Sequence, residues 1–237
     1  MRHAVGARAH FQPIVRLRDL RAVGFEALAR FDDGLSPLEH LRDAEKSGER
    51  EQLELRLIET AVAAAAALPR SAFVTLNASG RTMVDPFLSE LLQREERCWG
   101  LELFEGSPPE ECRAVREQVD QLEGFLLIDD AGSAFADENR IRELRPDIVK
   151  IDRALFWDSL AGAEGRRRLD SILAATRKAG ARSLVEGVED TDQLDAAIAL
   201  GVDYAQGYHL GRPTSAENVP EMLAELERRV GVDAAGL

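Results

Sequence analysis

Short apolar runs alternate with longer amphipathic segments along most of this chain. The runs that predict buried strands are Phe73–Leu76, Gly100–Leu103, Phe125–Ile128, Asp147–Ile151, Ser183–Val185 and a weaker one at Tyr204–Ala205. The segments that predict helices are Pro37–Ser47, Arg50–Leu68, Pro109–Leu122, Arg166–Ala179 and Thr191–Leu200. Strands that alternate with helices at this pitch pair in parallel and are joined by crossover helices. The pattern therefore predicts an α/β fold.

The two ends of the chain have different patterns. His10–Leu17 and Arg21–Ala27 indicate two β runs joined by a short polar link, so a hairpin and a mixed sheet are expected at the start. Ala216–Val230 predicts a terminal helix, followed by a frayed tail.

The predicted helices are bounded by ordinary capping residues. Gly48, Gly180 and Gly201 each stand where a helix is expected to end. Thr191 followed by Asp192 is expected to cap the start of another helix.

Composition narrows the class of protein. The length of 237 residues, with 45% hydrophobic and 31% charged residues, fits one soluble α/β enzyme domain. The net charge of −13 argues against binding to polymeric nucleic acid, which depends on Lys and Arg neutralising phosphates. An acidic protein that binds a phosphate ester needs a cation between the two, and divalent metals commonly supply it.

We expect a cytoplasmic protein without a membrane partner. Residues 1–10 have positive charge but no apolar run, so they do not form a signal peptide. The least polar stretch, Thr60–Leu68, is too short to cross a bilayer. Cys98 and Cys112 have no metal-ligand spacing, and such scarce cysteine suggests a reducing compartment.

Most of the residues at the ends of the apolar runs have side-chain oxygens that can bind a metal ion. They are Glu26, Asn77, Glu102, the pair Asp129–Asp130, Lys150, Glu186 and Gln206. In a parallel barrel the carboxyl ends of the strands converge on one mouth, where catalytic groups lie. Clustered carboxylates raise each other's pKa unless a hard cation takes their oxygens as ligands. Because the set contains no histidine or cysteine, Mg²⁺ or Mn²⁺ is favoured.

Each of these residues also has a plain structural interpretation. The Asp129–Asp130 pair could be a helix cap, Lys150 a surface lysine and Gln206 a loop amide. Glu186 and Glu189 could form a solvated turn. The recurrence of oxygen donors at successive strand ends is what favours metal-assisted catalysis.

A colinear series of motifs makes this interpretation more specific. The motifs are Phe11-Gln12-Pro13-Ile14-Val15, Gly24-Phe25-Glu26-Ala27-Leu28-Ala29-Arg30, Leu76-Asn77, Leu101-Glu102-Leu103-Phe104-Glu105, Ile128-Asp129-Asp130, Val149-Lys150-Ile151-Asp152, Val185-Glu186-Gly187-Val188-Glu189, Gln206-Gly207-Tyr208 and Leu210-Gly211-Arg212-Pro213. Together they resemble the signature of the EAL-domain phosphodiesterases over nearly the whole chain. A lone Glu-Ala-Leu tripeptide would carry no weight, whereas the ordered series is highly specific.

The resemblance implies a modified TIM-type (β/α)8 barrel with an antiparallel first strand. Residues 1–10 would be an extension, 11–230 the barrel domain and 231–237 a tail. The implied activity is hydrolysis of cyclic di-GMP to linear pGpG with two Mg²⁺ or Mn²⁺ ions. A homodimer is also implied by the resemblance.

The resemblance also implies roles for the site residues. The metal ligands would be Glu26, Asn77, Glu102, Asp129, Asp130 and Glu186, with Asp129 bridging the ions. Lys150 would position the attacking water and act in catalysis with Glu26 and Glu186. The substrate would be bound by Gln12, Arg30 and Gln206, while Glu105 and Glu189 would support the ligands from behind.

The loop after the aspartate pair departs from the family. Where the family typically has Asp-Asp-Phe-Gly-Thr-Gly-Tyr, this chain has Asp-Asp-Ala-Gly-Ser-Ala-Phe at 129–135. Ala131 removes an aromatic anchor, and Ala134 replaces a glycine with more backbone freedom. In the family this loop helps to set the second metal site and couples to dimerisation.

Three functions therefore stay open at this stage. The complete ligand set favours an active cyclic di-GMP phosphodiesterase, and the altered loop favours a catalytically weak or inactive cyclic di-GMP-binding regulatory module. A barrel enzyme for another phosphorylated substrate is the third. Turnover with added Mn²⁺ separates the first two, and cleavage of a different diester would support the third.

Overall fold

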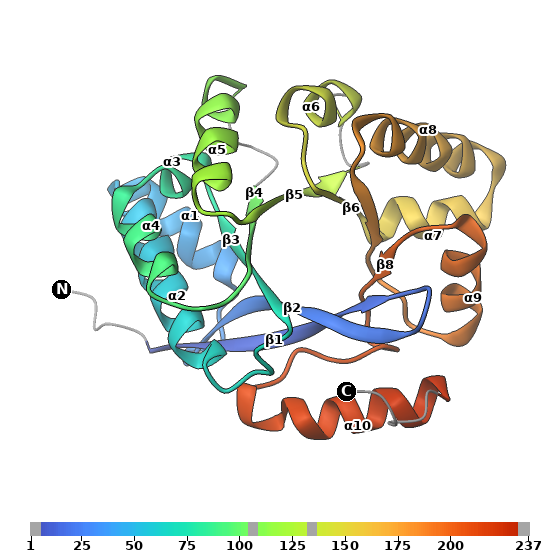
Figure 1. Ribbon diagram of the computed structural model, residues 1–237, viewed down its shortest axis with the longest axis horizontal. Coiled ribbons are helices and arrows are strands. Elements are labelled where there is room, and N and C mark those ends of the chain that lie inside the picture. The colour runs from blue at the N-terminus through green and yellow to red at the C-terminus, as the bar shows by residue number, and fades with distance from the viewer. Residues whose placement is uncertain (1–5, 104–108, 132–136, 232–237) are drawn as a thin grey trace.

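The computed structural model describes residues 6–103, 109–131 and 137–231, in which eight strands close into a barrel surrounded by helices (Figure 1). The strands are β1 (Ala7–Arg16), β2 (Arg21–Phe31), β3 (Phe73–Ala78), β4 (Trp99–Leu103), β5 (Phe125–Ala131), β6 (Ile148–Ile151), β7 (Arg182–Val185) and β8 (Tyr204–Ala205). The helices are α1 (Pro37–Ser47), α2 (Arg50–Ala65), α3 (Gly80–Met83), α4 (Pro86–Gln93), α5 (Pro109–Gln121), α6 (Asp137–Leu144), α7 (Arg153–Ala161), α8 (Ala163–Ala179), α9 (Thr191–Leu200) and α10 (Val219–Val230), with a 3₁₀ turn at Ala216–Asn218.

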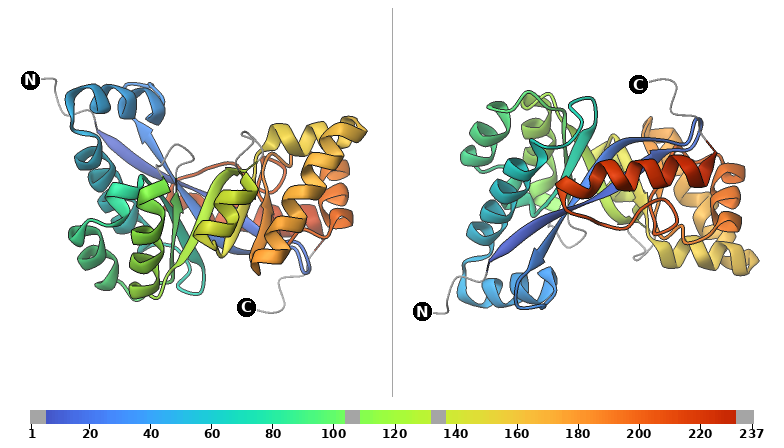
Figure 2. Two further views of the ribbon diagram at one scale, coloured as in Figure 1. Left: turned by 90° about the horizontal axis from the view of Figure 1, so that it is seen from above. Right: turned by 90° about the horizontal axis from the view of Figure 1, so that it is seen from below.

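The first strand runs against its two neighbours. β1 pairs antiparallel with both β2 and β8, and the remaining pairs around the barrel are parallel. The predicted barrel with an antiparallel first strand is therefore confirmed. Helix α10 lies across the β1–β2 hairpin and covers its outer face (Figure 2). The hairpin is thereby enclosed although no crossover helix joins its two strands.

The inside of the barrel changes from apolar to charged along the strands. Ile14, Leu127, Ile148 and Leu184 form a buried cluster at the amino-terminal end of the parallel strands. Burial of such side chains contributes about 1.5–3 kcal/mol each. Because side chains alternate across a strand, the next inward residue of β6 after Ile148 is Lys150. The apolar cluster thus forms a floor beneath a polar layer at the carboxyl ends.

Several predicted helix boundaries are confirmed, and one cap is corrected. Gly48, Gly180 and Gly201 end their helices in the left-handed conformation, with φ of 70°, 76° and 70°. The predicted Thr191–Asp192 cap is wrong. Asp190 is the N-cap residue, because its backbone is extended and its carboxylate accepts a hydrogen bond from the Gln193 amide at 2.8 Å.

Other elements differ in length from the prediction. The first two strands extend beyond the predicted runs, because they stay paired from Arg16 and Arg21 out to Ala7 and Phe31. Helix α2 ends at Ala65, short of the predicted Leu68. Pro69 disfavours helical geometry in the residue before it.

Candidate active site

The centre of the barrel mouth is the side chain of Lys150, which is only 1% exposed. Its Nζ lies 2.7 Å from Glu102 Oε2, 2.8 Å from Asp129 Oδ1, 2.9 Å from Glu186 Oε1 and 3.5 Å from Glu26 Oε1. These carboxylates come from β2, β4, β5 and the residue after β7. The structure thus brings the strand ends together, and the interpretation of Lys150 as a surface lysine is wrong.

The cluster holds more negative than positive charge. Burial raises the pKa of Glu102 well above its usual range, and the nearby Glu26 and Asp129 raise it further. Burial, with Asp129 and Glu26, raises the pKa of Glu186 to about 7, although Lys150 opposes the shift. Burial alone would lower the pKa of Lys150, but the surrounding carboxylates raise it well above its ordinary value. Lys150 therefore keeps its proton, and the carboxylates still lack counter-charge.

Two amides bracket the carboxylate of Glu26. Asn77 Nδ2 donates to Oε1 at 3.1 Å, and Gln206 Nε2 donates to Oε2 at 3.2 Å. Gln206 is 2% exposed, so its interpretation as a solvated loop amide is wrong. Asn77, in contrast, is exposed at the rim.

Several buried acceptor oxygens lack a hydrogen-bond partner within the described part of the chain: Glu102 Oε1, Asp129 Oδ1 and Gln206 Oε1. Asp129 Oδ1 lies close to Lys150 Nζ but without hydrogen-bond geometry. Unpaired buried acceptors are costly and call for an explanation.

The donor set suits a hard divalent cation. Carboxylate and amide oxygens are the ligands that Mg²⁺ and Mn²⁺ prefer, and a divalent ion supplies the missing positive charge. Over the described ranges, no three His, Cys, Asp or Glu side chains are already arranged around an ion position. The carboxylates turn toward the Lys150 ammonium instead, so an ion would take oxygens that now face Nζ.

Two clefts open from the centre. A cavity of about 330 Å³ reaches Glu26, Asn77 and Asp129 and continues between apolar residues of α1 and α2, such as Leu38 and Ile58. A second, of about 250 Å³, is lined by Gln12, Asp152, Arg153, Glu186, Gly187, Glu189, Gln206, Gly207 and Tyr208. The two clefts give a ligand room on both sides of the carboxylates.

Other predicted site residues lie around this centre. Gln12 Nε2 donates to the carbonyl of Gly211 at 3.2 Å. Arg30 donates to the carbonyl of Ala29 at 2.7 Å, further along β2 than Glu26. Glu189 is exposed at the rim of the second cleft.

Some of the predicted positions lie outside the described residues. They are Glu105, Ala134 and the side chain of Asp130. Ala131 is described and is completely buried, and its carbonyl accepts a hydrogen bond from the Asp152 amide at 3.1 Å.

Comparison with known proteins identifies the family. The sequence profile of the EAL domain matches residues 2–213. The chain belongs to the EAL domain family.

Relatives and solved structures agree with this assignment. The EAL chain is 29% identical over 252 residues to the uncharacterized protein y4lL of Sinorhizobium fredii, covering 99% of this chain and 30% of that protein. It is 29% identical over 223 residues to the probable cyclic di-GMP phosphodiesterase PdeG of Escherichia coli, covering 86% and 44%. The chain thus spans less than half the length of either relative.

A solved structure shares the fold. The manganese and cyclic di-GMP complex of Klebsiella pneumoniae BlrP1 aligns with a TM-score of 0.79 at 23% identity, covering 89% of this chain and 56% of that one. Within the described residues, each helix of the EAL domain is too short or too polar to span a membrane.

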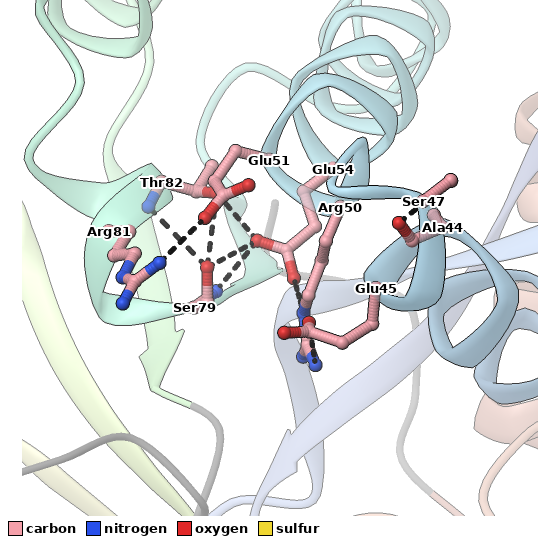
Figure 3. Close-up of polar contacts among 9 residues, drawn as sticks. All are labelled: Ala44, Glu45, Ser47, Arg50, Glu51, Glu54, Ser79, Arg81 and Thr82. Carbon is pink, nitrogen blue, oxygen red and sulfur yellow. Dashed lines mark hydrogen bonds and ion pairs between the residues drawn. The ribbon is translucent and has the colours of Figure 1, made fainter.

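Sequence reasoning missed one buried carboxylate near the site, that of Glu54 on α2. Glu54 is 4% exposed and occupies the same helix face as the buried Ile58, Ala61 and Ala65. Its hydrogen bonds reach Ser79, the N-cap residue of α3, and Thr82 within that helix (Figure 3). An acidic residue in the apolar stripe of a helix was the available signal, because such a residue must find a buried partner.

Proposed function

We propose that this EAL domain is a metal-dependent phosphodiesterase that hydrolyses cyclic di-GMP to linear pGpG. The observation that supports this most strongly is the convergence of Glu26, Glu102, Asp129 and Glu186 on one buried lysine. A purely structural cluster would have balanced charges and satisfied acceptors. This one has neither, and both deficits are those that divalent cations remove.

Glu26, Asn77, Glu102, Asp129, Asp130 and Glu186 would hold the two Mg²⁺ or Mn²⁺ ions. Such ions, when bound, stabilise charge on the phosphoryl oxygens and lower the pKa of water. Because Lys150 stays protonated, it acts as a hydrogen-bond donor and positive charge, and not as a base. Its proposed role is to orient the attacking water and to stabilise the negative charge that develops on the phosphoryl oxygens.

The two clefts suit a ligand that has two bases on either side of a central sugar–phosphate ring. Gln12 and Gln206 line the second cleft. Arg30 would bring positive charge to a phosphate. Glu105 and Glu189 would support the ligands from behind. The proposed working unit is a homodimer in the cytoplasm.

A regulatory module that binds cyclic di-GMP without cleaving it is the second candidate. The observation in its favour is the replacement at the end of β5, where the small, fully buried Ala131 stands in place of the family's aromatic residue. In that case the centre would bind the ligand but lack a correctly set second ion.

The deciding experiment is an assay of the purified protein with cyclic di-GMP and Mn²⁺ or Mg²⁺, with products separated by chromatography. We expect pGpG, and we expect a chelator to stop its formation. Binding is measured in parallel with Ca²⁺. Tight binding without product would contradict the phosphodiesterase proposal and support the regulatory module. Cleavage of a different diester alone would contradict both.

A further inference from the structure

Glu54 is a buried carboxylate whose two oxygens are both occupied. Its Oε2 accepts hydrogen bonds from the Ser79 amide at 3.0 Å, Ser79 Oγ at 2.7 Å and Thr82 Oγ1 at 2.6 Å. Its Oε1 accepts one from Arg50 Nε at 2.8 Å. Figure 3 shows the carboxylate between α2 and the short helix α3, pointing at the turn that Ser79 begins. One side chain of α2 thus ties down both ends of this turn.

The turn lies directly beyond a proposed metal ligand. Asn77 is the penultimate residue of β3, and Ser79 follows the last one as the N-cap of α3. The Asn77 side chain is exposed, so packing does little to fix its direction. One hydrogen bond, from Asn77 Nδ2 to Glu26 Oε1 at 3.1 Å, orients the amide, and the backbone on either side sets where the side chain starts. β4 pairs with the strand up to Ala78, and Glu54 holds the backbone from Ser79 onward.

Packing alone does not account for a charge at this position. Taking a carboxylate out of water is costly, and an apolar residue is often as stable or more stable in such a place. The hydrogen bonds of Glu54 outweigh that cost, since its pKa lies below the ordinary value in spite of burial. Unlike an apolar side chain, the carboxylate makes directional hydrogen bonds. These bonds fix the positions of Ser79 and Thr82 relative to α2.

We propose that Glu54 is a positioning residue of the metal centre, which fixes the end of β3 through Ser79 and Thr82 and so aims Asn77 at the ion. The proposal rests on the proposed function in taking Asn77 as a metal ligand. It predicts that Glu54 affects metal affinity through Asn77, in addition to what its hydrogen bonds contribute to the stability of the fold.

The test is a calorimetric titration of the full chain with Mn²⁺, without substrate. Glu54→Gln keeps the shape of the side chain, and we expect it to weaken Mn²⁺ binding by about 10- to 100-fold, as is typical when a residue behind a metal ligand is changed. Glu51→Gln is the matched control. Glu51 also links α2 to α3, with Arg81 at 3.5 Å, but its side chain is 38% exposed. We expect Glu51→Gln to bind Mn²⁺ as the wild type does.

A double-mutant cycle separates positioning from a general structural role. If Glu54 acts through Asn77, Glu54→Gln adds no further loss of affinity once Asn77→Ala is in place. All titrations are made well below the unfolding temperature of each variant. If Glu54→Gln does not fold, Ser79→Ala replaces it in the cycle. Ser79→Ala removes the hydrogen bond from the Ser79 hydroxyl to Glu54 and keeps the one from the Ser79 backbone amide. We therefore expect a smaller loss of Mn²⁺ affinity, which should again be absent in the Asn77→Ala background.

Unchanged affinity in Glu54→Gln, or losses that simply add in the double mutant, would overturn the proposal. Wild-type protein that binds no Mn²⁺ would overturn it as well. Wild-type protein that binds Mn²⁺ but leaves cyclic di-GMP intact would contradict the proposed function alone, because the cycle needs no turnover.

Discussion

Two buried clusters built around carboxylates lie at the same end of this barrel, and their hydrogen bonding and charge balance differ. Around Glu54, one carboxylate receives hydrogen bonds on both oxygens. Around Lys150, several carboxylates share one ammonium, and acceptor oxygens of Glu102 and Asp129 lack hydrogen-bond partners among the described residues. Burial opposes ionisation in both places, yet the pKa of Glu54 is lowered while that of Glu102 is raised.

The difference shows how to distinguish a structural cluster from a binding cluster. A buried charge with complete hydrogen bonding stabilises the fold around it and needs nothing more. A buried group of like charges with incomplete bonding destabilises the fold until a ligand arrives, and perturbed pKa values in a cleft mark such functional sites. The comparison can be tested by removing one member of either cluster.

The largest effect is expected from Glu26→Ala, which removes the carboxylate bracketed by Asn77 and Gln206. We expect all measurable turnover of cyclic di-GMP to be lost, because the variant lacks a proposed ligand of the catalytic ions. The measurement is product formation with saturating Mn²⁺, with Glu51→Gln as the control. Substantial residual turnover in Glu26→Ala would contradict its assignment as a ligand.

An effect of intermediate size is expected when Mn²⁺ is added without substrate, namely a rise in the stability of the fold. Mn²⁺ at about 100 times its dissociation constant should stabilise the fold by about 2.7 kcal/mol. For a domain of this size that corresponds to a rise in Tm of about 5–10 °C. Thermal unfolding followed by circular dichroism measures it, and a chelator should reverse it. A Tm that does not respond to Mn²⁺ would show that the Lys150 cluster is not a metal site.

The smallest expected effect concerns how the free energy of unfolding of the metal-free protein depends on pH. The two clusters should contribute to it in opposite directions. The lowered pKa of Glu54 contributes stability above the ordinary value of 4.5, which is lost as the pH falls through the folded-state value. The pKa of Glu186 is raised to about 7. Its contribution to stability is therefore fully present below pH 4.5 and is lost as the pH rises toward 7.

Urea unfolding at a series of pH values, with chelator present, tests this contrast. Glu54→Gln should flatten the acid loss of stability, and Glu186→Gln should flatten the loss between 4.5 and about 7. Equal pH profiles for the two variants would show that the clusters do not differ in the way described.

Much of the fold could be predicted because its signals are local. Apolar runs marked the parallel strands, and glycines such as Gly180 marked helix ends. Helix α7 gave no such signal, since Ala154, Leu155, Phe156 and Trp157 are adjacent and form no stripe along one face. Tertiary packing against α8 had to be known to recognise it.

The site, like the fold, has features that the local sequence predicts and others that depend on tertiary contacts. Oxygen donors after apolar runs were visible in the sequence, and barrel topology brought them together. The central place of Lys150 could not be derived from the local pattern, because a lysine within a strand as short as β6 has the same neighbours in sequence whether it points inward or outward. Glu54 meets Ser79 across 25 positions of the chain, and a contact between a helix and a distant turn leaves no periodic pattern.

The ammonium of Lys150 gives the barrel an internal counter-ion from the moment it folds. Small zinc domains have no such group and stay unfolded until their metal arrives. Here part of the repulsion among the carboxylates is offset before any divalent ion enters. With the proposed function, the chain is therefore expected to reach its native fold without metal, so that metal supply would govern when the domain works and not whether it folds.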